Sequence, residues 1–223
     1  MREQPLISAD SHVVEPADLW STRLDTAFRD HAPSLVMNPA GKKGLYFICD
    51  GLEPRLMSSA FASGVSPEAL LTYHQNTSLE DGRAGGWDPA PRLVDMALDG
   101  EAAEALQMPV SFHTSAGHGP ESKHKTRSRY QSNWKRQVYA TFMDDAIGIE
   151  LCHHVGKHTY MWVSDDPHTQ STWPRSREVI AQNFATVSDD VRHNITCNNV
   201  ADLYGFDLEE LVPTALRADA SSV

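Results

Sequence analysis

Acidic and histidine side chains in three parts of the chain could together hold a metal ion. Asp10 and His12 stand two residues apart in the run LISADSHVVE, and the alternation of side chains along a strand would place both on one face. His113 closes the run MPVSFHT, and Asp165 closes YMWVSD. Zn²⁺ and similar divalent ions take histidine nitrogen and carboxylate oxygen together. An isolated D-x-H pair is also typical of a turn-capping aspartate beside a core histidine, so the later segments decide between the two interpretations.

The chemistry expected of such a site depends on one open coordination position. An ion held by Asp10, His12, His113 and Asp165 would lower the pKa of a bound water and polarise a carbonyl or carboxylate. His113 and Asp165 are the expected catalytic residues, with Asp165 as the general base; Asp166 takes this role if the register differs by one.

Two further side chains are candidates for contact with a substrate. His168 follows a proline near Asp165, with a surface or structural role as the alternative. The guanidinium of Arg55 could hold a substrate carboxylate through two hydrogen bonds.

Strand and helix signals show which elements would position these groups. Asp88-Pro89 and Gly100 are typical of a helix start and stop. Helix propensity favours a helix in EAAEAL (101–106), with a brief buried strand as the alternative. Convincing strands are predicted at 6–14, 44–49, 108–114 and 160–164, with weaker ones at 102–106 and 194–198. Helices are predicted at 17–30, 66–76, 88–98, 129–142, 147–157 and 173–186, with helical turns at 189–197 and 201–204.

Length, composition and charge limit the class of protein. The 223 residues, 40% hydrophobic and 22% charged, indicate a single globular domain. No apolar run approaches the roughly 18 residues of a membrane span. The start MREQPLISAD has no signal-peptide core, and three widely spaced cysteines do not form a disulfide framework. The net charge of −11 disfavours nonspecific binding to nucleic acid, because contact with phosphates needs a cationic surface. We therefore expect a cytoplasmic protein. The expected partners are a small-molecule substrate and, if the chain folds, a second copy in a homo-oligomer (dimer), with no nucleic acid and no membrane.

Several stretches carry a family resemblance. They are ISADSHVVEPADLW, GGWDPAPRLVDMALDG, MPVSFHT, WKRQVYATFMDD, MWVSDDPHTQSTWPRS and NNVADLYGF. In this order they resemble the amidohydrolase-related family of the amidohydrolase superfamily, which includes aminocarboxymuconate-semialdehyde decarboxylase. The resemblance implies a metal-dependent (β/α)₈ TIM barrel, an α/β fold whose members are hydrolases or nonoxidative decarboxylases. Asp10 and His12 match the first-strand motif, often H-x-H in relatives. His113 matches the fifth-strand ligand, and Asp165 the seventh-strand aspartate.

The chain departs from the family by being short. A complete barrel takes about 250 residues, and this chain has 223. A single residue separates Leu106 from Met108, where the family has strands, helices and connections. Residues 120–129 form only a basic loop, where the sixth strand would be expected. We therefore expect one amidohydrolase-like domain over 1–223 whose barrel is incomplete, with an excursion at about 35–86 and internal deletions near 107 and 120–129.

Two functional hypotheses follow. The first is a metal-dependent hydrolase or nonoxidative decarboxylase of a small carboxylated or cyclic substrate, with one divalent ion, Zn²⁺ or alternatively Mn²⁺. The second is a catalytically inactive, truncated relative that acts as a noncatalytic or partner-dependent subunit, since an incomplete barrel leaves strand edges unpaired.

Overall fold

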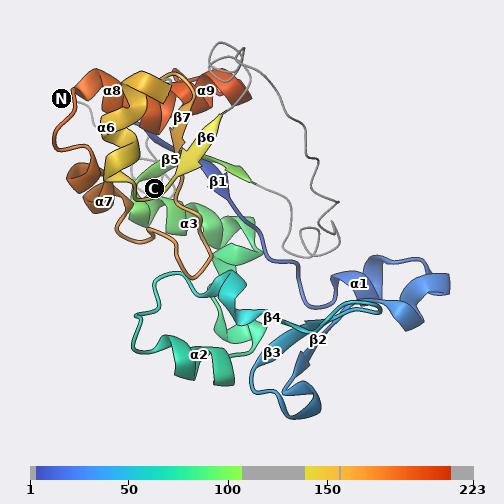
Figure 1. Cartoon of the computed structure of the whole chain (residues 1–223). Coiled ribbons are helices and arrows are strands. Elements are labelled where there is room, and N and C mark those ends of the chain that lie inside the picture. The colour runs from blue at the N-terminus through green and yellow to red at the C-terminus, as the bar shows by residue number, and fades with distance from the viewer. Residues whose placement is uncertain (1–3, 107–138, 156, 212–223) are drawn as a thin grey trace, which may run out of the picture.

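A computed structural model describes residues 4–106, 139–155 and 157–211 (Figure 1). The described chain mixes helices with three small sheets, which confirms the predicted α/β class, and its strands do not close into a barrel. His113, the strand predicted at 108–114 and both predicted deletion points lie outside the described residues. None of the described helices is long and apolar enough to cross a membrane.

Two parallel strand pairs lie at the centre of the structure. The first joins β1 (Leu6–Ser11) to β5 (Glu101–Leu106), and the second joins β6 (Ala140–Phe142) to β7 (Tyr160–Trp162). The strands predicted at 6–14, 102–106 and 160–164 are thereby confirmed, with shorter or shifted ends.

Hydrogen bonds just beyond β7 connect the two pairs. The Ser164 amide donates to Ser8 Oγ at 2.9 Å, and the Asp165 amide donates to the Asp10 carbonyl at 3.2 Å. The strands therefore follow one another in the spatial order β5, β1, β7, β6 (Figure 1). Among the described residues, no strand pairs with the outer edge of β5 or of β6.

The predicted excursion lies beyond the carboxyl end of β1 (Figure 1). The strand expected at 44–49 is the middle strand β3 of an antiparallel sheet, which agrees with its prediction as one arm of a hairpin. Alternate residues of β3, Leu45 and Phe47, pack against Val14, Met57 and Phe61. Helix α1 (Leu19–Arg23) precedes the excursion, whose elements are β2 (Ser34–Met37), β3 (Leu45–Ile48), β4 (Arg55–Leu56) and α2 (Leu70–Asn76).

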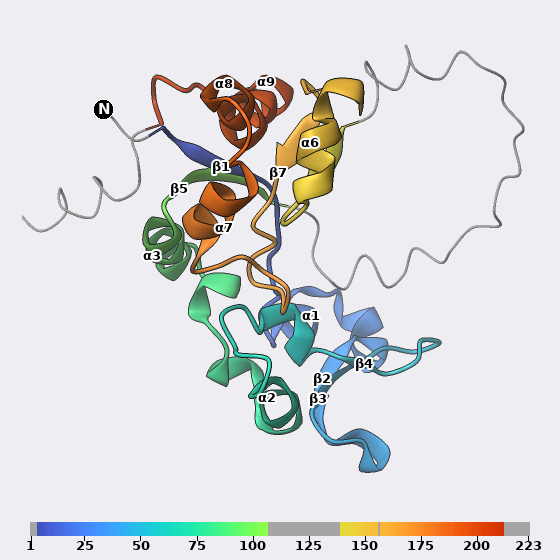
Figure 2. The ribbon, with the colours of Figure 1, turned by 60° about the vertical axis from the view of Figure 1, so that its left-hand side comes forward.

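The remaining helices follow β4 in the chain and cover the central strands. Helix α3 starts and stops as predicted, because Asp88 Oδ1 accepts the Ala90 amide at 3.0 Å and Gly100 takes a left-handed φ of 79°. Figure 2 shows α8 and α9 on the opposite side of the β1–β5 pair from α3. The helices are α3 (Pro89–Asp99), α6 (Ala146–Val155), α7 (Ser176–Asn183), α8 (Asp189–His193) and α9 (Asn199–Tyr204).

Four sequence-based predictions need correction. The helix predicted at 17–30 breaks, because Asp25 caps a separate 3₁₀ turn, Thr26–His31, by accepting the Ala27 amide. The 101–106 segment is the strand β5, since its small alanines pack beside β1, so the helix favoured by propensity is wrong. The weak strand at 194–198 is a π-helical turn between α8 and α9. The end of the helix predicted at 129–142 is instead β6.

Successive residues of β1 enter two different hydrophobic clusters, because side chains alternate between the two faces of a strand. Leu6 joins Ile149, Trp162 and Ile180, whereas Ile7 joins Cys197 and other residues of the π-helical turn and α9. Both faces of β1 are therefore buried before the chain reaches its polar end.

Helix α3 turns its polar face inward. Its buried residues follow helical spacing, and its large apolar side chains Leu93, Val94 and Leu98 are 55–65% exposed. The buried residues of α3 are Arg92, Asp95, Met96 and Asp99. Each buried charge has a partner: Arg83 binds Asp95, and Ser176 donates to Asp99 from both its amide and its hydroxyl. The buried face of α3 is therefore mostly charged, with Met96 as its apolar member.

Candidate metal centre

Three potential metal ligands from distant parts of the chain converge just beyond β1 and β7. The Nε2 atom of His12 lies 3.0 Å from Asp165 Oδ1, and the Nδ1 atom of His168 lies 3.0 Å from the same oxygen. The potential ligand atoms of all three residues lie within 4.8 Å of one another. The sequence predicted two members of this cluster as ligands and His168 as a substrate contact.

Asp10 adjoins the cluster without belonging to its tightest part. Its Oδ1 lies 3.4 Å from His12 Nε2. The Asp10 side chain is 29% exposed, whereas that of His12 is 10% exposed. The two histidine rings stack with centroids 4.0 Å apart and an interplanar angle of 25°. His12 therefore faces two carboxylates while its ring is held against that of His168.

Backbone hydrogen bonds fix the turn that carries Asp165 and His168. The His12 amide donates to the Asp166 carbonyl at 2.8 Å, and the His168 amide donates to the Asp165 carbonyl at 2.9 Å. Asp165 adopts a left-handed φ of 58°, a conformation that aspartate tolerates better than most residues do. The turn is thus tied to the end of β1, and its unusual backbone directs the carboxylate toward the histidines.

The excursion holds this turn from its other side. The Ser63 amide donates to the Pro167 carbonyl at 3.0 Å, and the Thr169 amide donates to the Ser59 carbonyl at 3.1 Å. These contacts give the excursion a structural role next to the cluster.

The charge state of Asp165 suits a ligand. Burial by itself raises the pKa of this carboxyl, but the hydrogen bonds and charges of His12 and His168 outweigh burial and lower it from 3.8 to about 2. Asp165 is therefore ionised at neutral pH and presents a carboxylate to two imidazole nitrogens.

The donor set fits a divalent ion. Two atoms each about 2.1 Å from a common ion lie no more than about 4.2 Å apart, and both pairs that involve Asp165 Oδ1 are 3.0 Å apart. Two nitrogens and one oxygen form the kind of set that Zn²⁺ accepts while keeping a position open. At present His12 Nε2 and His168 Nδ1 each form a hydrogen bond with Asp165 Oδ1. A bound ion would take the place of the ring protons in these two hydrogen bonds.

A buried charge network, which the sequence analysis missed, lies directly behind the turn. Arg92 binds Glu104 through two nitrogens, Nε at 2.8 Å and Nη2 at 2.6 Å, and its Nη1 lies 2.8 Å from Asp166 Oδ2. These three side chains are each only 7–8% exposed. Arg92 Nη2 also donates to the Asp166 carbonyl at 3.1 Å, the same oxygen that accepts the His12 amide. Charged residues at helical spacing, 92, 95 and 99, are the signal that could have revealed it.

The network also separates the roles of Asp165 and Asp166. Asp166 points its carboxylate at Arg92, whereas Asp165 points its own at the two histidines. The geometry therefore favours Asp165 over Asp166 as the ligand. Arg55 lies on β4, an outer strand of the antiparallel sheet, with an exposed side chain, and its contact with a substrate stays a prediction.

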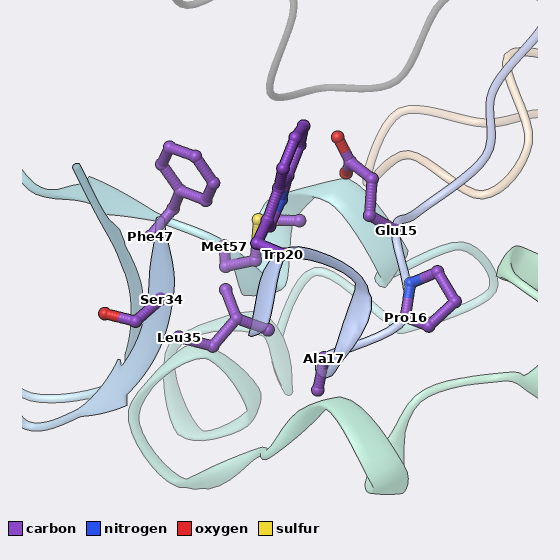
Figure 3. Close-up of a pocket in the computed structure, with 8 residues that line it drawn as sticks. All are labelled: Glu15, Pro16, Ala17, Trp20, Ser34, Leu35, Phe47 and Met57. Carbon is purple, nitrogen blue, oxygen red and sulfur yellow. The ribbon is translucent and has the colours of Figure 1, made fainter. Parts of the chain in front are cut away.

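A small cavity inside the excursion is too small for a substrate. Figure 3 shows it between the segment that follows β1 and the antiparallel sheet, with Trp20, Leu35, Phe47 and Met57 around it. Its volume of about 10 Å³ admits about one water molecule. This part of the excursion therefore serves packing.

A buried carboxyl at the start of β5 gives a testable pH effect. Burial raises the pKa of Glu101 well above its ordinary 4.5, and the neighbouring Glu104 and Asp99 raise it further. The folded protein therefore binds more protons than the unfolded chain, so this residue makes the folded state less stable as the pH rises above about 4.5. We expect Glu101→Gln to increase the free energy of unfolding more at pH 7 than at pH 4.5, as measured by urea denaturation. An equal effect at both pH values would contradict this.

Comparison with known proteins adds no assignment to this geometry. No family model matches the chain, and a search of curated proteins finds no match. The amidohydrolase resemblance therefore rests on the motifs alone, and the function has to be argued from the cluster.

Proposed function

We propose that the chain is a metal-dependent enzyme of amidohydrolase type, a hydrolase or nonoxidative decarboxylase that uses one divalent ion, Zn²⁺ or Mn²⁺. The observation that carries this proposal is the convergence of His12, Asp165 and His168 from distant parts of the chain to within 4.8 Å. An incomplete barrel is part of the proposal: β5, β1, β7 and β6 would be its remaining arc, with the ligands at the carboxyl ends of the strands, where barrel enzymes place their chemistry.

The residues of the cluster would bind the ion and assist the reaction. His12, His168 and Asp165 would hold the ion, and His113 remains a proposed additional ligand from outside the described residues. When bound, the ion would supply an acidified water and polarise a carbonyl or carboxylate of the substrate. Asp165 keeps a carboxylate oxygen ready to accept a proton. Asp10 Oδ1 lies 3.4 Å from His12 Nε2, the same nitrogen that would bind the ion, and its role as a further ligand stays a prediction.

Zinc titration of the full chain after EDTA treatment and buffer exchange tests the proposal. We expect about one equivalent to bind by calorimetry. His12→Ala should lower the affinity by more than the roughly 10–100-fold that loss of an outer-shell partner costs. His31→Ala is the matched control, because His31 is exposed, pairs with Asp50 at 2.7 Å and does not belong to the cluster. Less than a tenth of an equivalent bound, or equal affinities in both variants, would overturn the proposal.

The second candidate, a noncatalytic subunit that depends on a partner, is favoured by one observation. Within the described residues, no strand pairs with the outer edges of β5 and β6, and edge strands invite pairing with another chain. A monodisperse protein whose zinc-dependent hydrolysis of p-nitrophenyl acetate disappears in Asp165→Asn would contradict this candidate. Zinc binding without turnover, together with association into defined oligomers, would support it.

A further inference from the structure

A second hollow lies next to the candidate metal centre, on the side of α3. Its volume is about 270 Å³. It is bounded by the residue after His12, by the glycines before α3, by the first turns of α3 and by the end of β5. Its side-chain walls are mainly apolar and are formed by Val13, Trp87, Pro89, Leu93, Met96 and Leu106.

The size of this pocket suits one ring. An apolar cavity of about 150 Å³ accepts benzene, so about 270 Å³ has room for a single ring with a small substituent.

The charged residues of the pocket disfavour an anion. Arg92 is the only cationic residue among its described lining residues, and its guanidinium already binds the carboxylates of Glu104 and Asp166. One positive charge thus faces two negative charges, and Asp88 adds a third carboxylate at the edge. A ligand carboxylate entering here would lose hydration without gaining a free cation.

The pocket is connected to the metal centre through its own lining. Val13 follows His12 directly, and Arg92 contacts both the side chain and the carbonyl of Asp166, the neighbour of Asp165. A ring in this pocket would therefore lie at the same end of β1 as the proposed ion.

We propose that this pocket binds an uncharged single-ring compound and rejects a ring that carries a carboxylate. As the substrate subsite, it rests on the proposed function and narrows the substrate class to neutral cyclic compounds. It therefore favours the hydrolase over the decarboxylase, because a decarboxylase has to bind a carboxylate. As a ligand site, it stands on the volume, the apolar walls and the charge balance alone.

Benzamide and benzoate test the proposal, because they share ring and shape and differ in charge. Binding to the metal-free full chain is measured by ligand-observed NMR titration. We expect saturable binding of benzamide, and an affinity for benzoate at least about tenfold lower, since an unpaired charge in an apolar site costs more than 1.4 kcal/mol. Absence of benzamide binding, or equal affinity for both compounds, would overturn the proposal.

Two substitutions on α3 locate the binding. Leu93→Asp places a charge on the pocket wall and should lower benzamide affinity at least about tenfold. Leu98→Asp is the matched control, since Leu98 is similarly exposed on the same helix but does not line the pocket. Equal loss in both variants, or in neither, would contradict the assigned site.

The two proposals fail independently. Because the ring compounds are titrated without metal, selective benzamide binding together with absent zinc binding would overturn the enzyme and keep the pocket. Zinc binding that is lost in His12→Ala, without benzamide binding, would do the reverse.

Discussion

Arg92→Met is expected to lower the free energy of unfolding by about 3–5 kcal/mol, the range for removing one partner of a buried ion pair. The substitution leaves Glu104 and Asp166 buried without the guanidinium that binds both at 2.6–2.8 Å. Methionine fills much of the arginine volume, so the loss reports charge rather than a cavity. Urea denaturation at pH 7, followed by circular dichroism, measures it.

Removal of the Arg92 charge predicts that the loss of stability in this variant depends on pH. Burial raises the pKa of Asp166, and Arg92 opposes that rise in the native protein. Without Arg92 the folded variant binds more protons than its unfolded chain, so the loss should be larger at pH 7 than at pH 5. Arg23→Met, at an exposed arginine of α1, should change stability by less than about 0.5 kcal/mol. An Arg92→Met loss as small as that of this control would contradict the network.

Ile149→Ala is expected to cost about 2–5 kcal/mol, as large-to-small changes in a packed core do. Ile149 is fully buried on α6 and packs in the cluster that contains Leu6, Cys152 and Trp162. The change removes three carbons from the contact between α6 and the central strands. Guanidinium or urea denaturation at pH 7 gives the loss.

The same helix supplies the control for this prediction. Ile147 lies two residues earlier on α6 and is 71% exposed, so Ile147→Ala has the same helix-propensity change without a cavity. We expect it to alter the free energy of unfolding by less than about 0.5 kcal/mol. Similar losses in the two variants would show that α6 is not packed on the central strands in this register.

Local signals predicted the elements whose sequence and environment agree. The ligand-bearing ends of β1 and β7 followed from apolar runs that finish in Asp or His, and α3 followed from Asp88, Pro89 and Gly100. The segment 101–106 did not follow, because its helix propensity is overridden by packing of Ala102 and Ala103 beside β1. Propensity is a weak guide wherever tertiary contacts decide.

The candidate site was predictable in part for a similar reason. Spacing could suggest that Asp10 and His12 share a face, and an aspartate after a strand could suggest Asp165. Whether His168 joins the cluster or faces solvent depends on the path of the turn after Asp165. Long-range hydrogen bonds to the end of β1 and to the excursion set that path, and local sequence signals do not reveal them. The helical spacing of residues 92, 95 and 99 hinted at a charged inner face, but it could not show the partners of Arg92. An arginine on a helix is ordinarily solvated, and here two carboxylates from other elements pair with it in a buried network.

The left-handed backbone of Asp165 limits which residues evolution can place there. At a φ of 58°, asparagine and glycine are the replacements that keep the turn, and of these only asparagine keeps the shape of the side chain while removing its charge. Descendants that lost the chemistry would therefore be expected to carry asparagine or glycine at this position, whereas bulky or β-branched residues would disturb the turn itself. The residue found at this one position in related chains would thus separate loss of chemistry from loss of fold.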